Sequence, residues 1–150
     1  MSFAQPSLKG RALRLLSMRE HSRVELERKL ARFEEEEGTL AKALDELQAK
    51  GFINEARVIE SVLHRRAGKL GAARIKQELQ SKGLDPQAVR DAVTGLQETE
   101  RERAQEVWCR KFGAAPADAK EAVRQMRFLA TRGFTTDVIR RVVGGKTDDF

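Results

Sequence analysis

Few side chains in this sequence could do catalytic or metal chemistry. The only imidazoles are His21 and His64, and neither has an acidic residue or a cysteine at the spacing of a metal site or catalytic triad. We expect both at the surface or its boundary. The single cysteine, Cys109, excludes an internal disulfide and a cysteine-rich zinc site, and its place beside Trp108 in an apolar helical stretch is typical of core packing. The residue types predict no catalytic group, metal or cofactor, and a protein that is not an enzyme.

Two further motifs are better explained by structure than by chemistry. The stretch at 144–147 carries the Gly-Lys-Thr ending of a phosphate-binding loop. However, Arg140 stands where the first glycine should be, and a helical pattern precedes the motif in place of a strand. A frayed carboxyl end is the better interpretation. The four adjacent glutamates at 34–37 point in several directions, so they indicate a solvated acidic patch rather than an acid–base pair.

Basic residues give the one positive indication of function. The chain has 29 Lys and Arg against 23 Asp and Glu, which favours an anionic partner such as nucleic acid, an acidic protein groove or a nucleoprotein. Helical spacing places Arg74, Arg124 and Arg127 off the apolar lines of their helices, within stretches that have few acids nearby. Ordinary solvation explains any one such base equally well, but it explains the whole set less well. A basic face is therefore predicted from Arg65, Arg66, Lys69, Arg74, Lys76, Lys82, Arg124, Arg127, Arg132, Arg140 and Arg141.

The elements that would position these bases are all helical. Apolar residues recur at helical spacing almost everywhere, and nowhere do they alternate as in a half-buried strand. The pattern predicts an all-α protein with helices around 8–16, 26–33, 40–47, 58–63, 72–79, 89–96, 104–112, 122–130 and 138–143. Helix starts are expected at Ser22 with Glu25, Asp85 with Pro86, Thr99 with Glu102, and Asp118 with Glu121.

One short pattern repeats along this helical series. Segments 47–52, 79–84 and 129–134 each read Leu, two variable residues, a base, Gly, then a large apolar residue. This is a helix end, in which the glycine takes a left-handed conformation and the apolar residue folds back onto the helix. A new helix follows each time, at Asn54, Asp85 and Thr135. The pattern predicts related small helical bundles in tandem, with loops at 34–38 and 113–117 as candidate hinges.

Composition limits the remaining classes of protein. With 40% hydrophobic and 35% charged residues, the chain is too apolar to be disordered and too charged for a membrane span. The opening Met1–Pro6 has neither the basic nor the apolar region of an export signal. We expect a cytoplasmic protein.

Several of these segments together resemble the RecX family. The stretch 11–30 resembles the family's opening, and 51–57 looks like the entry to its second repeat. The segment 71–84 is similar to the family's most recognisable stretch, and 110–113, 126–134 and 137–140 fit its third repeat. A departure occurs at 54–59, where family members often have a more acidic turn and an aromatic near Val58. This difference alters local packing and leaves the fold unaffected.

The resemblance implies tandem three-helix repeats, here 1–53, 54–98 and 99–150, in an elongated, curved molecule that lies in the groove of a RecA filament on single-stranded DNA. Such proteins suppress the ATP hydrolysis, strand exchange and coprotease activity of RecA, and so modulate recombination, repair and the SOS response. A monomer with weak direct DNA binding is expected. Two alternatives stay open: a helix-turn-helix DNA-binding protein, and a helical adaptor for another partner.

Overall fold

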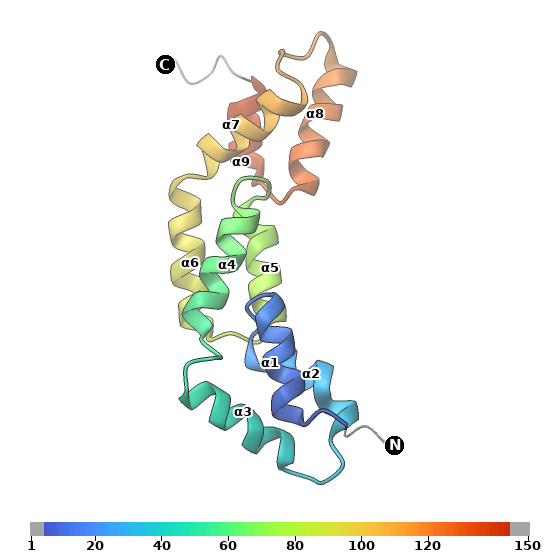
Figure 1. Ribbon diagram of the computed structural model, residues 1–150. Coiled ribbons are helices and arrows are strands. Elements are labelled where there is room, and N and C mark those ends of the chain that lie inside the picture. Colours follow the sequence, from blue (N-terminus) through green and yellow to red (C-terminus); the bar gives the residue numbers. More distant parts are fainter. Residues whose placement is uncertain (1–4, 145–150) are drawn as a thin grey trace.

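The computed structural model describes residues 5–144, and across them the chain is helical, with no β-strand (Figure 1). The Gly-Lys-Thr motif at 145–147 and the segment 1–4 lie outside the described residues. The all-α prediction is confirmed. The helices are α1 (Leu8–Met18), α2 (Arg23–Leu30), a short 3-10 turn η1 (Ala31–Phe33), α3 (Thr39–Ala49), α4 (Glu55–Arg66), α5 (Ala72–Ser81), α6 (Pro86–Glu98), α7 (Glu100–Lys111), α8 (Ala119–Thr131) and α9 (Thr136–Gly144).

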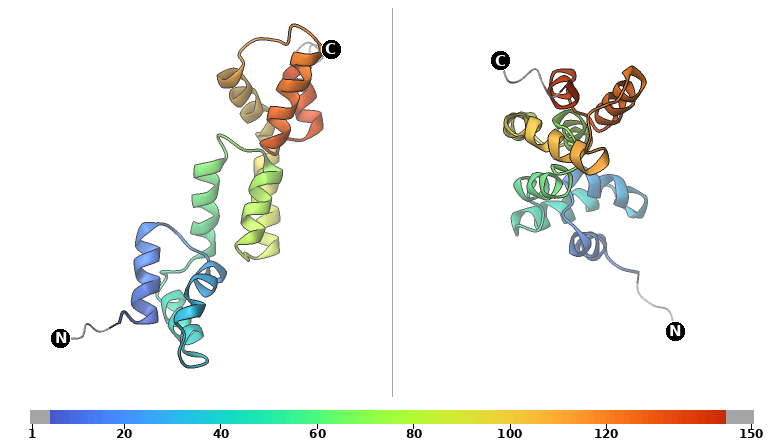
Figure 2. Two further views of the ribbon diagram at one scale, coloured as in Figure 1. Left: turned by 90° about the vertical axis from the view of Figure 1, so that its right-hand side faces the viewer. Right: turned by 90° about the horizontal axis from the view of Figure 1, so that it is seen from above.

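These helices form three bundles of three, and each bundle has its own apolar core. The first contains α1 to α3, the second α4 to α6 and the third α7 to α9. The bundles follow one another along the long axis of an elongated molecule (Figure 2), as predicted. Fully buried side chains at their centres are Leu26 and Leu44, Ile75 and Leu79, and Ala104 and Leu129. Because the three cores are separate, contacts between bundles must come from other residues.

The repeated glycine pattern ends three helices, as predicted. Gly51, Gly83 and Gly133 have φ of 84°, 67° and 90°, the left-handed region in which an L side chain is strained. At the third copy, the amide of Phe134 donates to the carbonyl of Leu129 over 3.3 Å, and Phe134 is buried. The first copy differs, because the Phe52 side chain is 46% exposed rather than folded into the core.

Three of the four predicted helix starts carry the expected cap. Ser22 and Glu25 form a capping box, and the carboxylates of Asp85 and Asp118 accept amides in the first turns of α6 and α8. Thr99 directly precedes α7, as predicted, but its side chain caps no amide there: the residue also ends α6, and its hydroxyl donates backward to the carbonyl of Leu96. Helices α6 and α7 therefore meet at a single residue.

The expected loops are present but do not join bundles. Segment 34–38 connects α2 to α3, and segment 113–117 connects α7 to α8, so each lies inside one bundle. The carboxylate of Glu34 accepts the amide of Leu40 over 2.8 Å, which ties the first of these loops to the start of α3. Movement between bundles would instead take place at 50–54 and at the α6–α7 connection.

The same contact joins both pairs of neighbouring bundles. At the first junction, the hydroxyl of Ser22 before α2 donates to the carbonyl of Lys82 after α5, over 2.7 Å. At the second junction, the amide of Gly71 before α5 donates to the carbonyl of Arg132 after α8, also over 2.7 Å. In each case the glycine-ended helix of one bundle meets the start of the middle helix of the preceding bundle (Figure 1). The negative end of one helix dipole therefore faces the positive end of another.

Gly71 leaves no room for a side chain at the second junction. A Cβ placed on it would lie 2.3 Å from the carbonyl oxygen of Gly133 and 2.5 Å from the amide nitrogen of Phe134, both backbone atoms. We expect Gly71→Ala to force the second and third bundles apart and to lower the free energy of unfolding by about 1–3 kcal/mol. Chemical denaturation followed by circular dichroism measures this change.

Gly95 provides the matched control, because it is an exposed position of helix α6 where an added Cβ would meet open space. Gly95→Ala should stabilise the protein by about 0.5–1 kcal/mol through helix propensity. Equal stability of the parent and the Gly71→Ala variant would contradict the close approach at this junction.

Candidate interaction surface

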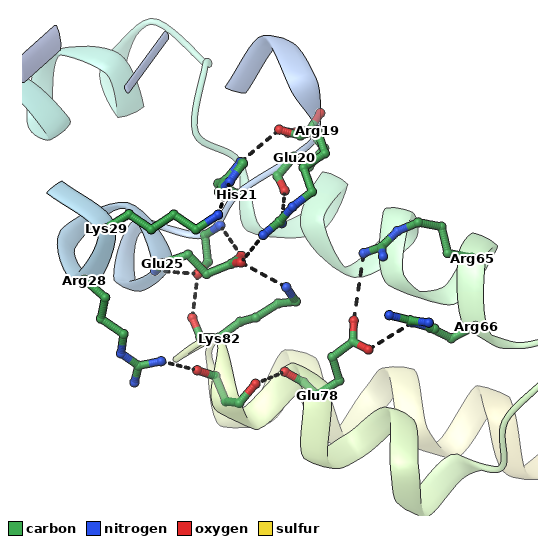
Figure 3. Close-up of polar contacts among 12 residues, drawn as sticks. Arg19, Glu20, His21, Glu25, Arg28, Lys29, Arg65, Arg66, Glu78 and Lys82 are labelled. Atoms are coloured by element: carbon green, nitrogen blue, oxygen red, sulfur yellow. Dashed lines mark hydrogen bonds and ion pairs between the residues drawn. The ribbon is translucent and has the colours of Figure 1, made fainter. Parts of the chain in front are cut away.

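The base Lys82 belongs to the first junction rather than to a free surface. Its side chain is only 10% exposed, and its ammonium lies 3.1 Å from the carboxylate of Glu25 (Figure 3). The same Glu25 carboxylate accepts a guanidinium NH of Arg19 over 2.8 Å and the amide of Ser22 over 2.9 Å. Lys82 thus neutralises an acid of the preceding bundle, which corrects its assignment to an accessible basic face.

Glu25 is the electrostatic centre of this junction. Burial would raise the pKa of its carboxyl, but Arg19, the Ser22 amide and Lys82 outweigh burial and lower the pKa from 4.5 to about 2. The charged carboxylate is therefore the stable form near neutral pH. Other bonds across the junction are the ion pair of Arg57 with Glu20, over 2.9 Å, and the bond from Arg28 to the carbonyl of Ser81, over 2.7 Å.

His21 is buried at the edge of the same network, so its predicted surface position is wrong. Only 1% of the residue is exposed. Nδ1 lies 3.0 Å from the carbonyl of Arg19, and Nε2 lies 3.0 Å from the ammonium of Lys29 (Figure 3). Burial lowers the pKa of His21, in keeping with a neutral ring that donates from Nδ1 and accepts Lys29 at Nε2. Helical periodicity could not indicate this site, because both partners depend on how the chain turns between α1 and α2.

The prediction that Cys109 lies in the core is also wrong. Cys109 is exposed, because five residues of helix carry it well away from the face of α7 that buries Ala104. The neighbouring Trp108 is half-buried and donates from its indole nitrogen to the amide oxygen of Gln125, over 2.8 Å. That bond explains why the polar Gln125 is tolerated in the third core.

Arg65 and Arg66 have an acidic neighbour that their place in the sequence conceals. Glu78 on α5 faces the end of α4, and its carboxylate lies 3.1 Å from Arg66 and 3.8 Å from Arg65 (Figure 3). All three side chains are partly exposed, so these pairs contribute little to stability. They do reduce the net positive charge of this part of the surface.

Arg74 holds the second junction together. Its guanidinium donates to the carbonyl of Thr131 over 2.5 Å, and its side chain packs against Gly133, where a Cβ would lie 2.3 Å from the Arg74 Cγ. Arg74 points away from the buried face of α5, as predicted. In that direction lies the third bundle. Arg74 is exposed, as expected of a base on the predicted face, but it also links the second and third bundles.

Two residues that the sequence did not single out complete the second junction. The carboxylate of Glu100 is buried and accepts the amide of Ala72 over 2.9 Å. The guanidinium of Arg103 donates to the carbonyls of Ala67 and Leu70, over 2.9 and 2.7 Å, and to that of Leu96. Helical periodicity cannot predict such a contact, because it does not show which residues of another bundle a long side chain will reach.

Beside this junction lies an acid-free groove of about 390 Å³, which we call the junction groove. It is lined by Gly68, Lys69, Val107, Arg110, Lys111, Phe128 and Arg132. Arg132 and Lys111 both lie over the ring of Phe128, at 4.9 and 5.4 Å from its centroid.

A second hollow of about 460 Å³ shares Arg132 with the junction groove and includes Arg66, Arg74 and Glu78. The structure therefore brings Arg66, Lys69, Arg74 and Arg132 together, and it adds Arg110 and Lys111, which the sequence analysis missed.

The remaining predicted bases do not join this cluster. Arg124 and Arg127 line a neighbouring groove of about 1030 Å³ along α8, which shares only Lys111 with the junction groove, and Arg124 pairs there with Glu121 over 3.1 Å. Arg141 lies 3.5 Å from Asp137 on α9. Lys76 and Arg140 are exposed on α5 and α9. The predicted bases are thus spread over several surfaces. Lys69 and Arg132 share the junction groove, whose lining contains no acid, although Arg110 in this groove lies 3.9 Å from Glu106 on the same helix.

Comparison with known proteins assigns the chain to a family. Models of the first, second and third three-helix domains of RecX match residues 9–47, 54–93 and 98–143, in that order. The protein named "Regulatory protein RecX" of Leptothrix cholodnii is 55% identical over 139 residues, which are 93% of this chain and 88% of that protein. The chain belongs to the RecX family. A protein of the same name from Herminiimonas arsenicoxydans is 46% identical and covers 99% of both chains.

Solved RecX structures share the fold of this chain. The crystal structure of RecX from Lactobacillus salivarius superposes with a TM-score of 0.74 at 22% identity, covering 92% of this chain and 93% of that one. A second crystal structure, of a regulatory protein RecX, gives a TM-score of 0.75 at 21% identity, with 93% and 72% covered. Within residues 5–144, no helix is long and apolar enough to cross a membrane.

The pH dependence of stability should report on Glu25. The unfolded chain takes up a proton near pH 4.5 but the folded protein only near pH 2, so the stabilisation from Glu25 is present above pH 4.5 and lost as the pH falls to about 2. The loss should be on the order of 3 kcal/mol, and Glu25→Gln should remove this part of the acid dependence. Urea unfolding at a series of pH values measures it. Glu60→Gln, at an exposed position of α4, is the control, and it should keep the parent's acid dependence.

Proposed function

We propose that this RecX-family protein binds RecA and RecA filaments on single-stranded DNA and inhibits their ATP hydrolysis, strand exchange and coprotease activity. The observation that carries the proposal is the ordered match of all three RecX domains, together with close relatives named regulatory proteins. On this view the protein is a monomeric cytoplasmic regulator with no catalytic activity, and its repeats span 1–53, 54–98 and 99–150. It modulates recombination, DNA repair and the SOS response.

The shape and charge of the molecule support this function. An elongated stack of bundles offers a long surface that suits contact with several protomers of a filament (Figure 2). The junction groove concentrates Lys69, Arg110, Lys111 and Arg132 with no acid in its lining, and such a surface attracts acidic protein or phosphate. We therefore propose the junction groove as the main contact with the nucleoprotein filament. Among the other predicted bases, those that are exposed contribute to long-range attraction.

The alternative of a helix-turn-helix DNA-binding protein receives less support. In such proteins a recognition helix enters the major groove and presents basic and amide side chains. The third helices of the first two bundles are poorly suited to this, because α3 has Lys42 against Asp45 and Glu46. Likewise, α6 has Arg90 against Asp91 and Glu98. An excess of acid on a recognition helix would repel the phosphates that border the groove.

The test is inhibition of DNA-dependent ATP hydrolysis by RecA. The parent protein should inhibit at concentrations below that of RecA. The double variant Lys69→Glu, Lys111→Glu reverses two exposed charges of the junction groove, and we expect it to need about tenfold more protein for half inhibition. The parent's inhibition should weaken more steeply with salt than the variant's, since fewer charge contacts remain to be screened in the variant.

The matched control reverses the same number of exposed charges elsewhere. Lys42→Glu, Arg90→Glu changes α3 and α6, and it should inhibit like the parent. Both double variants should melt within a few degrees of the parent, because exposed charges contribute little to stability. Absence of inhibition by the parent under conditions where RecA filaments form would contradict the proposed function itself.

A further inference from the structure

An arginine recurs at the same place in each bundle. Arg11, Arg57 and Arg103 each stand directly before a buried residue in the first turns of α1, α4 and α7. Those buried residues are Ala12, Val58 and Ala104. Arg11 and Arg103 are the fourth residues of their helices and Arg57 is the third, so the three arginines occupy corresponding positions to within one residue.

In the second and third bundles this arginine docks onto the bundle before it. Arg57 donates to the carbonyl of Gly51 over 2.6 Å and pairs with Glu20 over 2.9 Å. Arg103 donates to the carbonyls of Ala67 and Leu70, over 2.9 and 2.7 Å. At both junctions the partners are oxygen atoms of the preceding bundle. An arginine at this position therefore donates hydrogen bonds to oxygen atoms on the face where a neighbouring bundle packs.

In the first bundle the equivalent arginine faces a groove with no helical unit seated on it in the described chain. Arg11 donates to Gln5 over 3.3 Å and lies 3.7 Å from the centroid of the Phe33 ring. Beside it a groove of about 610 Å³ runs between α1 and the end of α2, and we call it the α1–α2 groove. Its apolar lining includes Leu15, Leu30, Phe33 and Met18, whose side chain is 74% exposed.

The rim of this groove is strongly basic. Its lining contains no acid, and its bases are Arg11, Arg14, Arg28, Lys29 and Arg32. Glu35 and Glu36 line the neighbouring groove, which shares Arg32 and Phe33, so the acid-free surface ends at η1. Exposed Met18 and half-buried Leu15 and Phe33, within a ring of bases, complement an amphipathic segment whose polar face is acidic.

We propose that the α1–α2 groove binds an acidic amphipathic helix of a partner protein. Apolar side chains of that helix would cover Met18 and Leu15, and its carboxylates would meet Arg14 and Arg32. The proposal goes beyond the regulation of RecA, since it concerns a different surface and can be tested on this chain alone.

Charge argues against a second copy of this chain as the occupant. By the geometry of the two junctions, a second copy would offer the free start of α8, whose groove contains Lys111, Lys120, Arg124 and Arg127 against two acids. Two basic surfaces repel each other. Nucleic acid is also disfavoured, because the guanidiniums of Arg11 and Arg32 already lie over the Phe33 ring, at 3.7 and 4.5 Å, where a base would have to stack.

The experiment uses the full chain labelled with ¹⁵N and a synthetic amphipathic helix of roughly 18 residues, with leucines on one face and glutamates elsewhere. Amides of 10–18 and 28–33 should shift on titration. A peptide with alanine in place of each leucine should bind at least about tenfold more weakly, because the apolar contact is lost.

A double variant tests the groove directly. Arg14 and Met18 are exposed, so Arg14→Glu, Met18→Glu should melt like the parent yet lose about tenfold or more in peptide affinity. The control Arg90→Glu, Gln97→Glu on α6 should bind like the parent. Equal binding by the groove variant, or shifts spread over all three bundles, would overturn the proposal.

Three other outcomes would assign the groove to a different occupant and so also overturn it. An oligothymidylate could shift the same amides at lower concentration than the peptide does. The chain could dimerise in sedimentation experiments with shifts at these residues. Deletion of residues 2–4 could strengthen peptide binding about tenfold, which would make the chain's own amino terminus the occupant. Because no RecA is present, failure here leaves the inhibition of ATP hydrolysis untouched.

Discussion

The structure depends on one contact made twice, in which a helix that ends in glycine is seated on the start of an earlier helix. Ser22 and Gly71 each donate to the carbonyl of the base before the turn glycine, Lys82 or Arg132. The carbonyls at a helix end need donors, and both junctions supply one: a side-chain hydroxyl at the first and a helix-start amide, which itself needs an acceptor, at the second. With three separate cores, these junctions fix how the bundles are placed relative to one another.

The junctions also decide which charged residues are left for binding. Lys82 and Arg74 are committed to an acid or a carbonyl of a neighbouring bundle. Arg57 and Arg103 are committed in the same way. Much of the remaining positive charge lies in the junction groove and the α1–α2 groove, although Arg28 and Arg110 in these grooves also donate to a carbonyl of a neighbouring bundle. Basic residues thus serve both in folding and in the proposed binding surfaces. The position of each base within its repeat decides which of these roles it has.

Local features of the fold could be predicted from sequence, because their causes are local. Helical period, the glycine ends and the caps at Ser22, Asp85 and Asp118 depend on residues a few positions apart. The cap at Thr99 could not be predicted from spacing alone, because the same residue ends the preceding helix. Likewise, the regular turn of a helix gives the direction of Arg74 but not what lies in that direction.

The candidate surface was harder to predict, because its residues meet across long separations. Arg74 binds a carbonyl 57 residues further along the chain, and Ser22 binds one 60 residues further. Whether a base is free or committed depends on such contacts, as Lys82 and Arg66 show. The resemblance to a family indicated the architecture and the partner, but no local pattern distinguished Lys69 from Lys82.

Separate cores have a thermodynamic consequence for the whole molecule. In an array whose units contact only their neighbours, stability is a sum of unit and interface free energies. The middle bundle has two interfaces, whereas the first and third have one each. The end bundles can therefore detach and reseat while the middle one stays folded. The molecule would then vary in reach and bend by discrete steps, and it could follow a partner surface of changing pitch without global unfolding.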